Sequence, residues 1–204
     1  MNTVITPGVA VRAATEIDNA ALLALCEACP MEGDIALRVD RAPSFFALNR
    51  LEGDDWGVGV AESETGEVSG CVAVARRDVW LDGRPATACY VSDLKVHPRA
   101  RRTGVADLLT EYARERCAAL AGEKVPSLLT ILAGNSRMEN RIGGPRGLPL
   151  LTRIATISAA AIPLLWERRE RVRGISVRRA APEDLALMAA LWRREGSRRQ
   201  FAGV

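Results

Sequence analysis

The stretch Arg101-Arg102-Thr103-Gly104-Val105-Ala106 decides the fold of this 204-residue chain. It follows a strand-like segment at 90–96 and opens an amphipathic pattern that predicts a long helix. A glycine followed two positions later by a small alanine lets consecutive backbone N–H groups point outward at a helix N-terminus, where the helix dipole adds partial positive charge. Arginines at 99, 101 and 102 add full charges beside it. The stretch therefore predicts an anion site, and its natural ligand is a pyrophosphate.

The spacing of this motif differs from the two commoner phosphate loops. The chain contains neither G-x-x-x-x-G-K-[ST] nor G-x-G-x-x-G, and the pattern is instead basic-x-x-Gly-x-Ala. Residues 94–109 (LKVHPRARRTGVADLL) resemble the acetyl-CoA-binding motif of the GNAT N-acetyltransferases, whose Q/R-x-x-G-x-G/A turn cradles the pyrophosphate of coenzyme A. The alternative for this motif is an ordinary strand-to-helix turn with solvated arginines.

The order of the predicted elements extends the resemblance over residues 9–165. An antiparallel meander with a tight turn at Asp82-Gly83 leads into the motif. The resemblance implies an α/β (α+β) fold with a mixed, largely antiparallel twisted sheet, flanked by helices and splayed at the acetyl-CoA site. We expect strands at 9–13, 35–39, 56–61, 68–75, 79–81, 128–132 and 154–161, and a return strand after the Asp82-Gly83 turn that ends at 96. We expect helices at 16–28, 105–120 and 136–141, the last capped by Ser136, and a short helix that starts at 43.

An internal repeat suggests a second unit. Residues 11–26 align without gaps to residues 177–192, and the identical pairs include Arg12/Arg178 and Asp18/Asp184. We therefore expect a GNAT-like domain at 1–166, a charged linker at 167–174, and the start of a second GNAT-like unit at 175–204. A C-terminal strand–helix extension that packs on the one domain is the alternative.

The resemblance also implies how the co-substrate acetyl-CoA would be held. Backbone N–H groups of Leu94, Lys95 and Val96 would bind the acetyl and pantetheine parts, and Asn135 would contact the cofactor. For Asn135 the alternative is a residue of the turn that starts a helix. The pyrophosphate would lie on Arg101, Arg102, Thr103, Gly104, Val105 and Ala106.

The catalytic groups are less well marked. In the family the general base often lies four or six residues before the valine of the motif, which points to Ser92 and Tyr90. Strand alternation predicts both on one face with Leu94 and Val96, and it sends Asp93, chemically the better base, to the opposite face. All three are candidate catalytic residues, and an ion pair or turn support is the alternative role for Asp93.

The general acid of the family, a tyrosine in the helix after the Asn135 position, is missing from this sequence. The chain reads Met138-Glu139-Asn140-Arg141-Ile142 there, so Glu139 is the one substitute, with a solvated helix carboxylate as its alternative role. The other tyrosine, Tyr112, falls on the apolar face of the predicted helix.

Composition narrows the remaining classes. The net charge of +3 and the aromatic content of 4% argue against a base-stacking nucleic-acid surface. Five cysteines with no signal peptide predict reduced thiols and a cytoplasmic location. The pair Cys26-x-x-Cys29 has no second pair, and the chain has a single histidine, so we expect no metal site. Residues 150–166 are apolar-rich, but Arg153 interrupts them, and we expect a buried strand rather than a membrane span.

The sequence therefore predicts an acetyl-CoA-dependent N-acetyltransferase. The acceptor would be a small-molecule or peptide amine, and the partner would be a second copy in a homodimer or a second GNAT unit. A non-catalytic acyl-CoA-binding regulatory domain is the second interpretation, and a basic nucleic-acid interaction module is the third.

Overall fold

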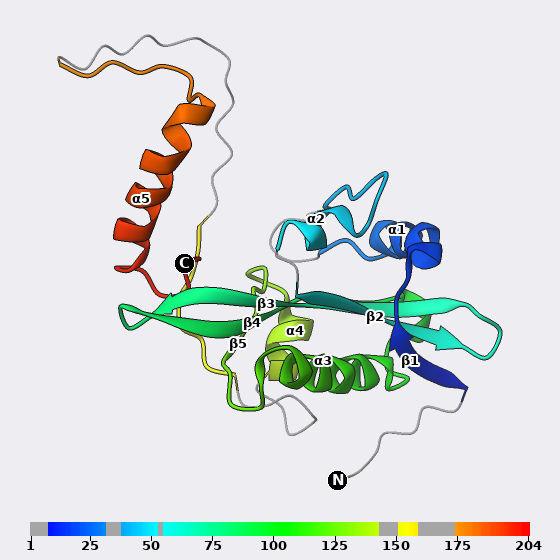
Figure 1. Cartoon of the computed structure of the whole chain (residues 1–204). Coiled ribbons are helices and arrows are strands. Elements are labelled where there is room, and N and C mark those ends of the chain that lie inside the picture. The colour runs from blue at the N-terminus through cyan, green and yellow to red at the C-terminus, as the bar shows by residue number, and fades with distance from the viewer. Residues whose placement is uncertain (1–7, 32–37, 53–54, 143–150, 159–173) are drawn as a thin grey trace.

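The computed structural model describes residues 8–31, 38–52, 55–142, 151–158 and 174–204. Its centre is a five-stranded sheet with the strand order β1-β2-β3-β4-β5 (Figure 1). Strands β1 to β4 pair antiparallel, whereas β5 runs parallel to β4. This mixed, largely antiparallel sheet confirms the predicted fold class. The strands are β1 (Val9–Ala13), β2 (Trp56–Ser63), β3 (Val68–Leu81), β4 (Arg84–Val96) and β5 (Ser127–Leu128).

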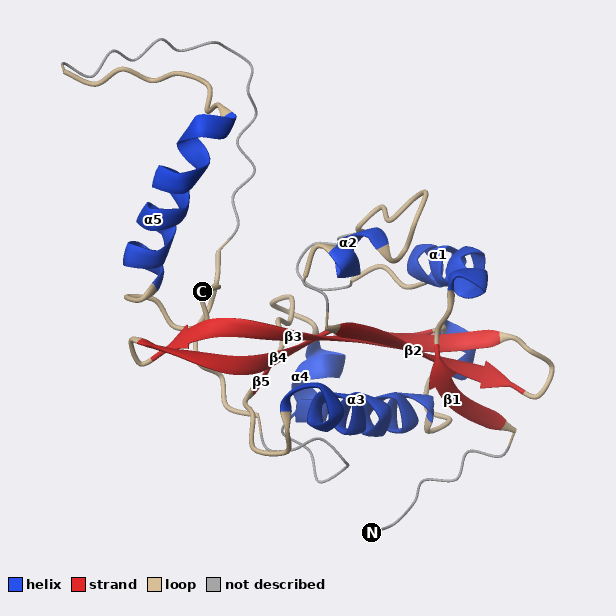
Figure 2. Cartoon of the chain, in the orientation of Figure 1, coloured by secondary structure: helices blue, strands red, loops and turns tan. Residues whose placement is uncertain are grey.

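Helices cover both faces of the sheet (Figure 2). We call one the α1 face, because α1 (Asn19–Ala28) and the short α2 (Ala47–Arg50) lie on it, and the other the α3 face, covered by α3 (Val105–Ala121). A 3-10 turn at Glu16–Asp18 leads into α1, so the helix predicted at 16–28 is confirmed. The helix α4 (Ser136–Ile142) follows β5.

Each face has its own apolar core. On the α1 face, the fully buried Leu22, Phe45 and Phe46 belong to one cluster with sheet residues such as Val60 and Ala73. Phe45 and Phe46 are thus core residues, as expected. On the α3 face, the cluster comprises Ala61, Val72, Val105, Leu109 and Ala113. Burial of such side chains contributes roughly 1.5–3 kcal/mol each, so the two layers fix the sheet between the helices.

The hairpin that joins β3 to β4 forms where the sequence predicts it. Asp82 has a φ of 51° and Gly83 a φ of 73°, so both residues of the turn are left-handed, which matches the right-handed twist of the flanking strands. The two strand pieces expected at 68–75 and 79–81 are one continuous strand, β3. This long hairpin brings β4 back across the sheet to the predicted anion site.

Two predicted strands are wrong over the residues described. The strand expected at 128–132 is reduced to Ser127–Leu128, and residues 151–158 have no regular structure. Ile154 and Ile157 are 62% and 80% exposed, so a buried last strand at 154–161 is not seen there, and residues 159–161 lie outside the described part. No described strand covers the outer edge of β5, so nothing in that part of the chain extends the sheet further. Most of the strand expected at 35–39 also lies outside the described residues.

The predicted repeat recurs as a set of hydrogen bonds. Arg12 donates to the two carboxylate oxygens of Asp18 at 2.8 and 2.9 Å, and Arg178 donates to those of Asp184 at 2.6 and 2.7 Å. In both copies the N–H group three residues before the aspartate donates to its Oδ2 atom, at 2.7 and 2.8 Å. In both copies a 3-10 turn then leads into a helix, α1 or α5 (Leu185–Gly196). The strand expected before the second helix is wrong, because residues 175–181 have no regular structure.

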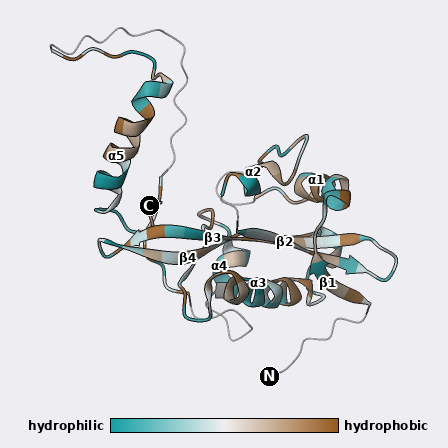
Figure 3. Cartoon of the chain, viewed as in Figure 1, coloured by the Kyte–Doolittle hydropathy of each residue, from teal (hydrophilic) through white to brown (hydrophobic). Residues whose placement is uncertain are grey.

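The C-terminal segment contacts the sheet along the end of β3 and the turn that follows it. Helix α5 stands away from the two layers (Figure 3), and Leu187 and Trp192 on it are 74% and 55% exposed. Beyond the helix, the N–H of Trp80 donates to the carbonyl of Ala202, and the N–H of Phe201 donates to the carbonyl of Trp80, both at 2.8 Å. The end of the chain is therefore held along β3, while the apolar side of α5 stays open to solvent.

Candidate functional site

The turn between β4 and α3 has the main-chain geometry of an anion site. Arg102 has a φ of 68° and Gly104 a φ of 92°, so two left-handed residues lie just before the helix. The hydroxyl of Thr103 donates to the carbonyl of Ala100 at 2.7 Å, which closes the loop. Left-handed residues in such a loop turn neighbouring N–H groups to one side, and the first N–H groups of a helix have no acceptor within it. Val105 and Ala106 open α3 at this point.

The charges around this turn are mostly positive. Arg99 and Arg102 are exposed and Arg101 is half-buried, and none of the three has an ion-pair partner within the described part of the chain. The one acidic side chain in the first turn of α3, Asp107, is paired with Arg141 of α4 at 2.5 Å. Its negative charge is therefore offset, and the end of the helix stays attractive to an anion.

Strand β4 loses its neighbour on the β5 side before it reaches this turn. The parallel pairing of β4 with β5 covers only Cys89 and Tyr90, whereas β4 continues to Val96. Over the described residues, the β5-side edge of β4 beyond Tyr90 therefore has no strand partner. This is the splayed edge at which Leu94, Lys95 and Val96 are predicted to bind a cofactor through their backbone.

A β-bulge changes which side chains share a face near this edge. Ala73 pairs with Ser92 and Cys71 pairs with Lys95, so Asp93 and Leu94 together oppose a single residue of β3. Asp93 is left-handed, with a φ of 51°, which aspartate tolerates better than most residues. Because the extra residue reverses the alternation, residues beyond the bulge point to the face opposite to the predicted one.

The predicted placement of the three catalytic candidates is therefore wrong in part. Leu94 and Val96 pack in the α3-face cluster. Ser92 follows Ala73 onto the α1 face, and Asp93 also turns toward that face, where it meets Arg41 from the segment before α2. The structure thus brings Asp93 to the same side of the sheet as Ser92, which alternation alone does not predict.

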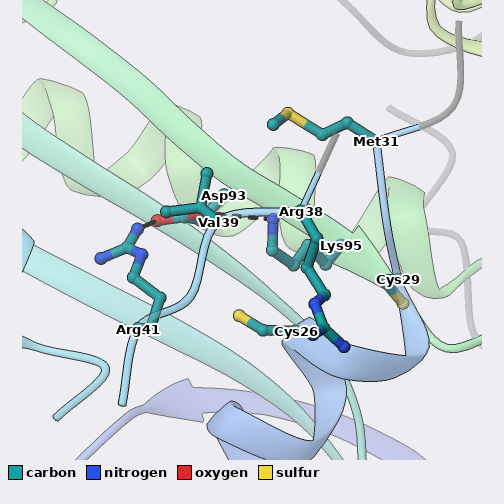
Figure 4. Close-up of a pocket in the computed structure, with 8 residues that line it drawn as sticks. All are labelled: Cys26, Cys29, Met31, Arg38, Val39, Arg41, Asp93 and Lys95. Atoms are coloured by element: carbon teal, nitrogen blue, oxygen red, sulfur yellow. Dashed lines mark hydrogen bonds and ion pairs between the residues drawn. The ribbon is translucent and has the colours of Figure 1, made fainter. Parts of the chain in front are cut away.

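Asp93 is held between two cations (Figure 4). Its carboxylate pairs with the guanidinium of Arg41 and lies 3.4 Å from the ammonium of Lys95. The side chains of Arg41 and Asp93 are only 7% and 11% exposed. The ion-pair role considered for Asp93 is what the structure shows. A cavity of about 10 Å³, the size of one water molecule, adjoins the group and is lined by Cys26, Cys29, Met31, Arg38, Val39, Arg41, Asp93 and Lys95.

Sequence reasoning missed a second ion pair on this face, in which the glutamate is largely buried and the arginine is partly exposed. Glu52, which follows α2, lies with its Oε1 atom 3.0 Å from Arg77 of β3, and the guanidinium of Arg77 stacks 4.5 Å from the ring centre of Tyr90. A signal for it was present, because an arginine that faces a covered sheet surface requires a partner. Tyr90, a predicted candidate, is therefore fixed by Arg77.

The residues proposed after β5 have structural partners. The Oδ1 atom of Asn135 accepts the N–H of Met138 at 3.2 Å, so Asn135 caps α4 and the predicted cap, Ser136, is the first helical residue. Glu139 is exposed. Tyr112 packs over Gly59 in the core, where burial raises the pKa of its hydroxyl, and it is no candidate acid.

The described residues hold neither a cluster of metal ligands nor a helix that could span a membrane. All five cysteines are buried, and none of them forms a disulfide. In the described ranges, no group of three or more His, Cys, Asp or Glu side chains could hold a metal ion. Within the same ranges, none of the helices combines the length and the apolar character that a membrane span requires.

The split sheet and the main-chain anion turn define the class: an α/β protein that can hold an anionic ligand between β4 and α3. The chain belongs to the Acetyltransferase (GNAT) family, whose sequence model matches residues 16–140. The general activity of that family is acyl-CoA-dependent acetyl transfer to an amine. No curated protein sequence matches the chain significantly.

Two of the matching solved structures, each with a TM-score of 0.52, show the same fold. A mutant BH1408 protein from Bacillus halodurans is 18% identical, with a TM-score of 0.52, and the match covers 72% of this chain and 99% of that one. AAC(6')-Iy, solved with the bisubstrate analog CoA-S-monomethyl-acetylneamine, is 13% identical, with a TM-score of 0.52 and coverages of 74% and 99%. Glucosamine-6-phosphate N-acetyltransferase from Arabidopsis thaliana is 18% identical, with a TM-score of 0.49 and coverages of 72% and 97%.

Proposed function

We propose that this protein transfers the acetyl group of acetyl-CoA to an amine, with the pyrophosphate of the cofactor on the turn at 101–106. The observation that carries the proposal is the pair of left-handed residues, Arg102 and Gly104, directly before α3. In this proposal they turn main-chain donors toward the pyrophosphate, and the helix dipole adds positive potential there, as do the arginines that have no ion-pair partner among the described residues. Membership of the GNAT family supports acetyl-CoA as the ligand.

The splayed edge of β4 supplies the rest of the cofactor site in this proposal. Backbone groups of Leu94, Lys95 and Val96 would bind the pantetheine and acetyl parts, because this edge has no strand partner among the described residues beyond Tyr90. Asn135, at the start of α4, would contact the cofactor from the other side of the gap between β4 and β5. Backbone N–H groups near the thioester carbonyl would stabilise the negative charge that develops on its oxygen.

Ser92, Tyr90 and Asp93 remain proposed catalytic residues on the acceptor side. Ser92 and Asp93 lie on the α1 face at the bulge, and Tyr90 lies two residues before Ser92 where the sheet splits. Ser92 would position a water molecule or the amine, and Asp93 would attract a cationic acceptor while it holds Arg41. The acceptor would be a small-molecule or peptide amine. None of the five cysteines forms a disulfide, which supports a reducing, cytoplasmic location.

We also propose the domain organisation expected from the sequence. Residues 1–166 would form the acyl-transfer domain, 167–174 the linker, and 175–204 the start of a second unit of the same fold. The repeated hydrogen bonds of Arg12 with Asp18 and of Arg178 with Asp184 support this division. The contact of the chain end with Trp80 favours the docked extension instead.

The test of the cofactor site is acetyl-CoA binding by isothermal titration calorimetry at fixed salt. Gly104→Asp should weaken binding at least ~10-fold, or about 1.4 kcal/mol, because the new carboxylate repels the pyrophosphate and a side chain strains the left-handed position. Gly66→Asp is the matched control, since Gly66 has a φ of 83° in the turn between β2 and β3 and open space around it. Equal affinity of both variants would overturn the pyrophosphate assignment.

A second candidate function is acyl-CoA binding without catalysis. Tyr112, one of the two tyrosines in the chain, lies in the core, and the exposed Glu139 occupies the helix in which the family carries its acid. This protein would then bind acetyl-CoA in the same calorimetric experiment, but would release no thiol from it with any amine.

A further inference from the structure

The ion pair between Glu52 and Arg77 is unusual because it is incomplete, with a largely buried glutamate against an arginine whose side chain is 40% exposed. The side chain of Glu52 is 13% exposed, and only its Oε1 atom is paired. Its Oε2 atom is buried, with no hydrogen-bond partner in the part of the chain that the structure describes, and the same holds for Nε of Arg77. A buried carboxylate oxygen without a partner is costly, and structural ion pairs normally satisfy both oxygens.

The position of this pair is on the acceptor side of the proposed chemistry. Arg77 pairs in register with Ala88 and stacks on Tyr90, so it lies beside the point where β4 and β5 separate. Glu52 reaches the same place from the end of α2, which lies over the α1 face (Figure 1). The stack on Tyr90 fixes the guanidinium and thereby holds Glu52 in one orientation.

The charges that face Glu52 come from three segments. Burial raises the pKa of the Glu52 carboxyl, and Asp93 of β4 raises it further, while Arg77 of β3 and Arg41 before α2 lower it. Burial is the largest of these effects, so the pKa lies above the ordinary value of a glutamate. A base with a raised pKa is better matched to proton transfer near neutral pH.

We propose that Glu52 is the general base of the acetyl transfer and that Arg77 is its positioning residue. The acceptor amine arrives as an ammonium ion, since amines of the lysine type have a pKa of about 10. Glu52 takes one proton from the ammonium, the amine nitrogen forms a bond to the thioester carbonyl carbon, and the carbon–sulfur bond breaks. The nitrogen loses its second proton as the amide forms, and coenzyme A, which leaves as the thiolate, takes up that proton through solvent. This assignment rests on the proposed acetyltransferase function.

The alternative is a purely structural pair that fixes the end of α2 to the sheet. It predicts that loss of Glu52 lowers stability and leaves the pH dependence of turnover unchanged. The two roles therefore differ in the pH profile, which a structural pair does not control.

The experiment compares the full chain with Glu52→Gln, with Arg77→Gln, and with Glu111→Gln as a control on the exposed Glu111–Arg114 pair of α3. Acetyl-CoA binding is measured by calorimetry, and thiol release is measured from pH 5 to 9 with spermidine, kanamycin, glucosamine 6-phosphate and water as acceptors. Glu52→Gln should keep the Kd for acetyl-CoA and lose turnover by ~10²–10⁴-fold. Glu111→Gln should leave both unchanged.

Arg77→Gln provides a readout that does not depend on loss of activity. Removal of the cation that lowers the pKa of Glu52 should move the acidic limb of kcat/KM to higher pH, and a structural role would leave that limb in place. Turnover by Glu52→Gln within threefold of the parent chain, or an unmoved limb in Arg77→Gln, would overturn the proposal. Acetyl-CoA that binds but releases no coenzyme A with any of these acceptors, water included, would overturn the proposal as well. A parent chain that does not bind acetyl-CoA would instead remove the proposed function itself.

Discussion

Asp18 offers the most direct test of how the fold is held together. Its carboxylate accepts two hydrogen bonds from Arg12 and one from the N–H of Thr15, and its side chain is 7% exposed. These bonds, of which that from Arg12 is the strongest, lower the pKa of Asp18 from 3.8 to about 2. A difference of this size corresponds to about 2 kcal/mol of folding free energy at neutral pH.

Asp18→Asn keeps the size and the acceptor of the side chain but removes its charge. We expect the loss of about 2 kcal/mol to lower the Tm by roughly 4–8 °C in a chain of this size. Because the folded-state pKa is depressed, the stabilisation is full above about pH 4 and is lost as the pH falls toward 2. The difference in the free energy of unfolding between the parent chain and the variant should therefore fall to about half at pH 3.

The matched control is Asp184→Asn, which removes the same charge from the second copy of the constellation. Arg178 is 66% exposed, and an ion pair in such a position contributes little. Calorimetric scans at pH 7 and pH 3 should show an unchanged Tm for this variant. A Tm of Asp18→Asn within 1 °C of the parent at pH 7, or equal losses in the two variants, would contradict the argument.

Three further predictions concern the turn, the core and the C-terminal segment. Arg102→Gly should raise the Tm slightly, because glycine adopts a φ of 68° without strain. The same variant should weaken acetyl-CoA binding in calorimetry, because a positive charge is lost. A lower Tm would contradict the left-handed conformation of Arg102. Gly59→Ala should cost about 1–3 kcal/mol in chemical denaturation, since its Cβ would lie 2.5 Å from the ring of Tyr112; an unchanged midpoint would exclude that close packing. Removal of residues 175–204 should leave one cooperative transition in a thermal scan if those residues begin a second unit; an unfolded product would establish the docked extension.

The parts of the fold that the sequence predicts are those specified by local signals. Alternating apolar residues and the Asp82-Gly83 turn predict the β3–β4 hairpin, and the glycine of the turn together with the apolar face of the following helix predicts α3. These signals lie within a few residues of the structure that they form. The strand expected at 154–161 had no such support, because an apolar run becomes a strand only when a neighbour pairs with it.

The bulge at Asp93 shows a second limit. Periodicity assumes that one residue opposes one residue, and the register shift between Cys71 and Ala73 breaks this rule without a glycine to mark it. All side chains after the bulge then point to the face opposite to the predicted one. The alternation argument therefore placed Leu94 and Val96 with Ser92, although the structure places them on opposite faces.

The two halves of the proposed site depend on different kinds of information. The proposed anion turn consists of one continuous segment whose main chain would do the binding, so its glycine and its arginines are enough to predict it. The acceptor side is assembled from side chains of three distant segments: Arg41 and Glu52 flank α2, Arg77 lies in β3, and Asp93 lies in β4. No spacing in the sequence connects these residues, and only the packing of α2 on the sheet brings them together. A pyrophosphate has the same shape in every acyl-CoA, so a short main-chain motif is enough to bind it. Acceptors differ from one enzyme to another, so their site is built from side chains that only the tertiary structure brings together.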